Sequence, residues 1–299
     1  MRIGLALQPS GSLFFVADEK GLFKKHNIDL EIVNYPSGKR ALNDGLLKNK
    51  VDLITTSEVP FVFSSFKHKD LKILSSIFTA DNVNRIIARR DVDIAKPSDL
   101  KGKKIGTQKS SAVHYFLHLF LLENNLSDDD INIEFMKAEK LPLALASGKL
   151  DGFSMREPYI TEAKKQLAEN AIIFSEPGIY NQVEVLVTNN AYLENNQEAV
   201  ERILSALKDA EAYFNDYPSE SDEIIARKFN VSVSVAESYR TEVKQRVSLD
   251  QSTLLLIESI ARWAMKNNMV SGQNMPDYMD FIHYTSLRNI DEKSVTIIH

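Results

Sequence analysis

Cysteine is absent from the 299-residue sequence. Its absence excludes disulfides, thiolate nucleophiles, Cys-ligated zinc and iron–sulfur clusters. The sequence also lacks the G-x-S-x-G, H-E-x-x-H, glycine-rich phosphate-loop and G-x-G-x-x-G patterns of common enzymes and nucleotide binders. His114 and His118 have the i, i+4 spacing of helical metal ligands, but no third ligand accompanies them. We therefore expect no catalytic residues, no metal and no cofactor.

An excess of positive charge is also absent, because 36 Lys and Arg stand against 41 Asp and Glu, a net charge of −5. Nucleic acids and anionic membranes bind basic surfaces, so we expect neither as a partner. No apolar run approaches the ~20 residues that span a bilayer. Residues 1–7 are typical of a strand rather than of a signal peptide. If the protein is exported, we expect its targeting segment to be missing from this sequence.

What the sequence does contain is a repeat of itself, at an offset of about 100 residues. Ile3-Gly4 and Ile105-Gly106 each lead to a turn that carries Gln and Ser. In both copies an Ile-rich strand and a Lys-x-Asp segment with a following Glu and Pro come next, at 28–33, 50–60, 131–136 and 149–158. Each copy is predicted to form alternating strands and helices, which favours two α/β lobes.

The remainder of the chain decides how these lobes are connected. Val183–Thr188 is predicted to be a strand, and helices are predicted at 197–217, 220–228, 233–241, 252–266 and 276–287. Because the second copy is already complete, we expect this helical tail to return to lobe 1. The predicted organisation is lobe 1 at 1–88, lobe 2 at 89–186 and the return to lobe 1 at 187–299. Two chain crossings then form a two-strand hinge.

In open α/β sheets, ligands bind beyond the carboxyl ends of the strands. Helix N-termini there direct N–H groups outward and favour negative charge. We expect the duplicated lobes to turn these ends toward a shared cleft. The predicted ligand-binding residues lie in the turns after the first and third strands of each copy: Gln8, Ser10, Gly11, Ser57, Glu58, Gln108, Ser110, Ser111, His114 and Arg156.

These residues also have structural interpretations. A serine before a helix is a common N-cap, and Glu58 is typical of an acid that stabilises a first helical turn. Arg156 suits either a surface ion pair with Glu157 or bidentate binding of an oxyanion. His114 either faces the ligand or packs beside Tyr115. The sequence leaves these alternatives open.

Several segments together resemble one family. They are Phe15–Phe23, Pro97–Gly106, Ser110–Phe116, Gly148–Asp151 and Glu157–Tyr159. On these segments the chain is similar to the nitrate/sulfonate/taurine-type (SsuA-like) solute-binding proteins of ABC importers, which include binders of a thiamine pyrimidine precursor. The residue before Glu-Pro is often aromatic in that family. Here it is Arg156, which favours an acidic ligand.

The resemblance implies a type II periplasmic-binding-protein fold, a hinged cleft, no catalysis and a periplasmic or membrane-anchored extracellular location. The implied partners of the monomeric protein are a membrane permease and a small anionic or zwitterionic ligand such as a sulfonate, taurine or nitrate. A thiamine pyrimidine precursor is the second ligand class. The family's ligand contacts carry over onto Gln8, Ser10, Gly11, Ser57, Ser110, Ser111 and His114.

Two other functions fit the same arrangement. One is a sensory module of a receptor, with the same pocket and no transport role. The other is an enzyme on the same scaffold, which needs an acid and a base. Glu58 with His114 is the one pair that the sequence offers for those roles. The related eukaryotic pyrimidine-forming enzymes need a cysteine-rich run, which this sequence lacks.

Overall fold

The computed structural model describes residues 1–6, 8–271 and 274–298. The chain divides into two compact units: unit 1, Met1–Thr79 with Gln182–His299, and unit 2, Ala80–Asn181. The helical tail therefore belongs to unit 1. The chain crosses between the units after Thr79 and after Asn181, earlier than the expected positions after 88 and 186. Strand pairing explains the difference, because residues 85–89 pair within the second sheet and residues 182–189 pair within the first.

Each unit is built on one mixed sheet. Sheet 1 has the order β11 (Lys244–Ser248), β4 (Leu71–Ala80), β10 (Gln182–Asn189), β3 (Leu53–Ser57), β1 (Arg2–Ala6) and β2 (Glu31–Tyr35). Sheet 2 has the order β7 (Asn132–Phe135), β6 (Lys104–Thr107), β8 (Gly152–Met155), β5 (Arg85–Arg89) and β9 (Ala171–Phe174).

The strand orders match the sequence repeat. In sheet 1, β1 lies between β2 and β3 and is parallel to both, and β3 is antiparallel to β10. In sheet 2, β6 lies between β7 and β8 in the same way, and β8 is antiparallel to β5. β10 begins directly after one chain crossing, and β5 begins a few residues after the other. The repeat predicted from the sequence is therefore present as a repeated sheet topology.

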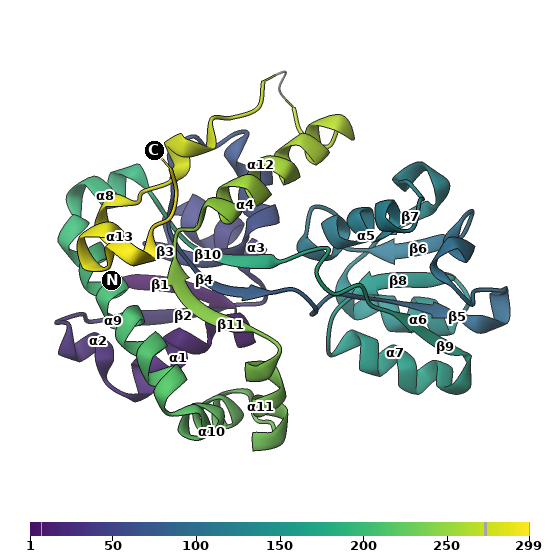
Figure 1. Cartoon of the computed structure of the whole chain (residues 1–299), viewed down its shortest axis with the longest axis horizontal. Helices are drawn as coiled ribbons and strands as arrows, with labels where there is room; N and C mark the ends of the chain where they lie inside the picture. The colour runs from purple at the N-terminus through teal and green to yellow at the C-terminus, as the bar shows by residue number, and fades with distance from the viewer. Residues whose placement is uncertain (7, 272–273, 299) are drawn as a thin grey trace. The chain divides into compact units, whose positions relative to one another are not determined.

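Helices cover both faces of each sheet (Figure 1). Unit 2 has α5 (Ala112–Glu123) on one face and α6 (Leu141–Ala146) and α7 (Tyr159–Leu167) on the other. Unit 1 has a larger set: α1 (Ser12–Glu19), α2 (Leu22–Lys25), α3 (Gly38–Arg40), α4 (Glu58–Ser65), α8 (Asn190–Asn195), α9 (Gln197–Asp216), α10 (Pro218–Phe229), α11 (Val233–Thr241), α12 (Gln251–Lys266) and α13 (Thr285–Ile290).

The long helix α9 shows why the tail packs on unit 1. Val200, Ile203, Leu204 and Leu207 recur at helical spacing and are fully buried. α9 packs against α1, whose Leu13–Ala17 segment is buried as well. At about 1.5–3 kcal/mol for each large apolar side chain removed from water, this interface alone binds the tail to the first repeat.

The tail is less helical than the sequence predicts. Residues 244–248 form the edge strand β11, in which Gln245, Val247 and Ser248 are buried. The helix predicted at 276–287 is instead a short 3-10 turn, Tyr278–Phe281, followed by α13. Asp277 accepts the Met279 N–H and Ile282 bridges to Ile73 of β4, which ends the helix early. At 276–287 tertiary pairing outweighed local helix propensity, whereas β11 lies in a stretch between two predicted helices.

Candidate functional site

The carboxyl ends of β1, β2 and β3 lie at one end of sheet 1. β10 runs antiparallel to β3 and starts at the same end, with Glu184 opposite Ser57. Four segments therefore meet there, and we refer to them as edge 1: residues 8–12, 37–39, 56–58 and 182–184. This is the position at which open α/β sheets bind ligands. Of the residues predicted from the sequence, edge 1 contains Gln8, Ser10, Gly11, Ser57 and Glu58.

The first segment of edge 1 is a tight turn that leads into α1. Pro9–Gly11 forms a 3-10 turn in which the Gly11 N–H donates to the Gln8 carbonyl at 2.9 Å. The Ser12 hydroxyl donates to the Pro9 carbonyl at 2.7 Å instead of capping the helix. Ser10 and Gly11 are buried within this turn. Hydrogen bonds inside the turn thus fix its shape before any ligand is present.

Gly38 and Glu184 approach each other at edge 1, and the sequence analysis missed both. A Cβ on residue 38 would lie 2.7 Å from Thr56 Cα and 3.2 Å from Glu184 Oε1. Only glycine therefore allows α3 to sit this close to β3 and β10. Glu184 is 4% exposed although it carries a carboxylate. The available signal was the charge of Glu184 within the apolar strand Val183–Thr188.

Glu58 and Ser57 lie where β3 turns into α4. Glu58 is fully buried, and its Oε2 accepts the Val183 N–H at 3.2 Å. Ser57 is the N-cap residue of α4, but its side chain makes no capping hydrogen bond. Glu58 therefore ties the first turn of α4 to the start of β10, at the residue before Glu184.

The corresponding end of sheet 2 is built in the same way. β6 and β8 end there, and the antiparallel strand β5 begins there with Arg85 opposite Met155. We refer to residues 84–85, 108–111 and 155–157 as edge 2. The Ser111 hydroxyl donates to the Gln108 carbonyl at 2.7 Å, as Ser12 does to Pro9. Ser111 is the N-cap residue of α5 and likewise makes no side-chain capping bond.

Ser110 has a backbone conformation that is unusual for a residue with a side chain, φ = 53°. Its N–H donates to Nδ1 of His114 at 3.3 Å. Nδ1 is therefore the acceptor, so a neutral His114 carries its proton on Nε2. The His114 ring is 3% exposed and meets Phe135 edge-on at 4.9 Å. His114 thus packs against Phe135, while Tyr115 turns toward Tyr180.

Arg156 follows β8 and is half-buried. No ion pair to Glu157 is found within the described part of the chain, where Glu157 instead accepts the Thr161 N–H at 3.1 Å. The predicted structural alternative for Arg156 is thus not what the structure shows. Lys109 adds another positive charge, with Nζ 5.4 Å from the Phe135 ring centroid.

Asn84 and Arg85 are a further part of edge 2 that the sequence analysis missed. Asn84 is 3% exposed and comes directly before β5. Its position relative to β8 is the same as the position of Glu184 relative to β3. Arg85 donates to the carbonyls of Asn82 and Asn84. Sheet register alone reveals this correspondence, because the two strands are not parts of the sequence repeat.

The two edges differ in charge. Edge 1 carries Glu58 and Glu184 against Lys39, whereas edge 2 carries Arg85, Lys109 and Arg156 against Glu157. Edge 1 is therefore net negative and edge 2 net positive. Carboxylates favour cationic groups and N–H donors, and guanidinium groups favour oxyanions. Edge 1 thus offers groups that suit a cation, and edge 2 offers groups that suit an anion.

The described residues contain no cluster of three or more His, Asp or Glu that suits a metal ion. His118 pairs with Asp128 at 2.8 Å. His114 and Glu58, the acid–base pair that an enzyme would need, belong to unit 2 and unit 1, respectively.

The model of the family described as NMT1/THI5 like matches residues 8–221. A candidate binding protein of Brucella abortus is 27% identical over 270 residues, 87% of this chain and 79% of that protein. A candidate thiamine biosynthesis protein of Haemophilus influenzae is 23% identical over 220 residues, 72% of this chain and 68% of that protein.

Solved structures show the same fold. The periplasmic aliphatic sulphonate-binding protein SsuA of Escherichia coli superposes with a TM-score of 0.79 at 21% identity, over 95% of this chain and 91% of its own. The predicted type II periplasmic-binding-protein fold with two α/β lobes is confirmed, and its two sheets are mixed. The desulfurization enzyme DszB has the same fold, with a TM-score of 0.65 at 17% identity over 98% and 99% of the two chains.

Proposed function

Because the chain belongs to the NMT1/THI5-like family, we propose that it is the solute-binding protein of an ABC importer. In this proposal the protein works outside the cytoplasmic membrane and delivers its ligand to a membrane permease. No helix in the described residues is long and apolar enough to cross a membrane. The sulphonate-binding function of the similar E. coli protein supports this role.

We propose that the ligand is a small zwitterion, such as an aminoalkyl sulfonate of the taurine type. The opposite charges of the two edges carry this proposal. A protonated amine suits edge 1, where Glu58 and Glu184 are both buried, and a sulfonate suits edge 2, where Ser110 and Arg156 lie. A simple anion such as nitrate suits edge 2 alone and makes no use of the carboxylates of edge 1.

Binding by both edges accounts for a useful affinity. A micromolar dissociation constant corresponds to about −8 kcal/mol, and each charge-assisted hydrogen bond contributes about 1.5–3 kcal/mol. Three or four such contacts, shared between the edges, together contribute about 4.5–12 kcal/mol, a range that includes that value. We propose that the two units close on the ligand about the two chain crossings, as hinged domains do.

An aminopyrimidine, as in a thiamine precursor, is the second candidate. Its amino group is a donor that matches a buried carboxylate such as Glu184, which is the specific observation in its favour. The likeness to the thiamine biosynthesis protein of H. influenzae points the same way. Its weakness is edge 2, because a neutral ring gives Arg156 and Lys109 no anion to bind.

Calorimetric titration with a matched set of probes tests the proposal. Taurine carries both charges, ethanesulfonate lacks the amine and ethylamine lacks the sulfonate. We expect taurine to bind at least about tenfold more tightly than either fragment, since each fragment loses one charge-assisted contact. Ethanesulfonate binding as tightly as taurine would contradict the zwitterion proposal. Tighter binding of 4-amino-5-hydroxymethyl-2-methylpyrimidine would select the second candidate.

The proposal includes binding without chemistry, although DszB shows that an enzyme can share the fold. Incubation of the protein with the tightest probe, followed by mass spectrometry of the small molecule, separates the two activities. We expect the probe to be recovered unchanged. A product that forms with the wild-type protein and not with Glu58→Gln or His114→Ala would favour the enzyme.

A further inference from the structure

The turn at residues 8–12 is held from outside by a residue far away in the sequence. Gln245 lies on β11 and is 5% exposed. Its Nε2 donates to the Pro9 carbonyl at 2.9 Å, the same oxygen that accepts the Ser12 hydroxyl at 2.7 Å. Gln245 lies beyond residues 8–221, so the family match does not point to it.

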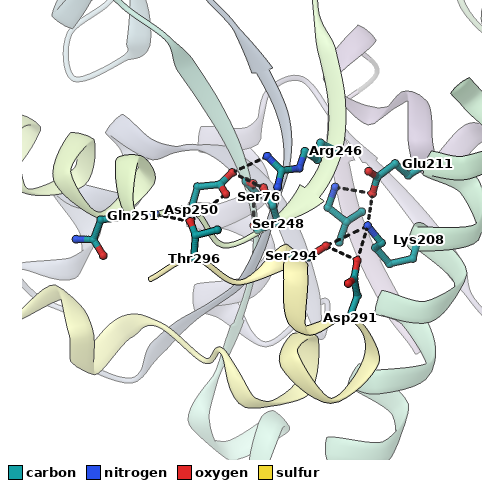
Figure 2. Close-up of polar contacts among 11 residues, drawn as sticks. Ser76, Lys208, Glu211, Arg246, Ser248, Asp250, Gln251, Asp291, Ser294 and Thr296 are labelled. Carbon is teal, nitrogen blue, oxygen red and sulfur yellow. Dashed lines mark hydrogen bonds and ion pairs between the residues drawn. The ribbon is translucent and has the colours of Figure 1, made fainter. Parts of the chain in front are cut away.

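β11 provides a fixed support for this side chain. The Val247 N–H donates to Glu211 Oε2 at 3.0 Å, and the Ser76 hydroxyl donates to the Ser248 carbonyl at 2.8 Å. Figure 2 shows the polar network that continues from these contacts through Lys208, which pairs with both Glu211 and Asp291. β11 is therefore anchored to α9, to β4 and to the C-terminal segment.

The chemistry of the amide fixes its orientation. Because a carbonyl only accepts hydrogen bonds, the amide nitrogen of Gln245 must face Pro9. The amide oxygen then points away, and it is buried without a hydrogen-bond partner among the described residues. An apolar side chain of similar length would avoid the cost of burying an unsatisfied oxygen. The hydrogen bond to Pro9 is therefore the contribution that the amide makes here.

We infer that Gln245 is a positioning residue for the turn at residues 8–12, and thereby for ligand binding at edge 1. The consequence for ligand binding rests on the proposed function, whereas the support of the turn does not. The edge strand that the sequence analysis missed thus has a direct connection to the candidate site. Two hydrogen bonds on one carbonyl, one local and one from β11, set the position of Ser10 and Gly11.

Replacement of Gln245 by methionine tests this inference, because methionine keeps the length and removes both polar atoms. Gln251→Met is the matched control: Gln251 also holds a backbone group, accepting the Ile298 N–H at 3.0 Å, but it is not part of edge 1. We expect amide hydrogen exchange of residues 8–15 to become about tenfold faster in Gln245→Met and to stay unchanged in the control.

Binding is the second readout. We expect Gln245→Met to weaken the binding of taurine, or of the tightest amino-bearing probe, by about fivefold. The melting temperature should change by no more than about 3 °C. Gln245→His keeps an N–H donor and should restore slow exchange. Exchange of residues 8–15 that matches wild type in Gln245→Met overturns the inference. If no probe binds wild type, the ligand proposal fails, and the exchange data still decide the role of Gln245.

Discussion

In unit 1, the segments that follow the strands bring two buried carboxylates, Glu58 and Glu184, to the end of the sheet. In unit 2, the corresponding segments bring Arg156, Lys109 and Arg85. The architecture of the two edges is shared down to the serine hydroxyl that donates to the carbonyl three residues earlier. The repeated topology thus gives edge 1 and edge 2 a similar backbone, and their side chains determine which chemical groups each edge suits.

The largest effect is expected from edge 1. Glu184→Gln keeps the shape and removes the charge, so an amino-bearing probe should lose about 10–100-fold in affinity, the value of a charge-assisted hydrogen bond. Glu198→Gln, on the exposed face of α9, is the control and should bind as wild type does. Calorimetry with taurine measures both. Equal affinities for the two variants would mean that edge 1 does not contact the amine.

The paired change at edge 2 is next in size. Ser110→Ala/Arg156→Ala removes a hydroxyl and a guanidinium and should weaken taurine binding by at least about tenfold. Stability in urea should remain near wild type, because Arg156 has no ion pair in the described part of the chain. Thr161→Ala/Lys165→Ala, on the exposed face of α7, is the matched double control. Calorimetry that finds wild-type affinity in the Ser110/Arg156 variant would refute the role of edge 2.

A smaller effect separates backbone strain from binding at edge 2. Ser110 has a φ of 53°, which glycine adopts without steric cost. Ser110→Gly should therefore raise the free energy of unfolding by up to about 1 kcal/mol. It should also weaken the binding of taurine, because the hydroxyl is removed. Urea unfolding and calorimetry on the same preparation measure the two effects. A variant that is less stable than wild type would show that the backbone here is unstrained.

The smallest effect concerns the pH dependence of unit 1. Burial lowers the pKa of His283 below its ordinary value of 6.5, and nearby Lys72 lowers it further while Glu201 opposes the shift. The unfolded chain then binds more protons than the folded one between that lowered pKa and 6.5. Stability is therefore full above 6.5 and falls as the pH drops through that interval.

Urea unfolding at pH 7.5 and pH 5.5 tests this expectation. His283→Gln keeps a polar side chain near Ser286 and removes the titration, so it should lose less stability on acidification than wild type does. Equal losses in the two proteins would mean that other groups govern the pH dependence.

Much of the fold was predictable because the sequence repeat indicates the order of strands and turns in both units. The turns after β1 and β6 have the same residue types, so their place at the ends of parallel strands followed from the pattern. β11 was not predictable, since Lys-Gln-Arg-Val-Ser has little strand character and pairs only because β4 offers an open edge. Long-range pairing, which no local pattern records, decided that strand.

The candidate site was likewise predictable only in the segments that belong to the repeat. Residues in the turns, such as Gln8 and Ser110, follow from the repeat and the rule for open sheets. Glu184 and Asn84 lie on the antiparallel strands, whose register relative to β3 and β8 depends on the chain crossing between units. Gly38 matters because of a backbone approach to Thr56 that only coordinates reveal.

We propose that both edges hold one ligand at the same time. The absence of cysteine makes a direct test simple, because Lys24→Cys in unit 1 and Lys165→Cys in unit 2 give two unique positions for spin labels. Electron–electron distance measurement without and with saturating taurine then reports on closure. We expect a shorter and narrower distance distribution with taurine. An unchanged distribution, at a concentration where calorimetry shows the site to be filled, would contradict the proposal.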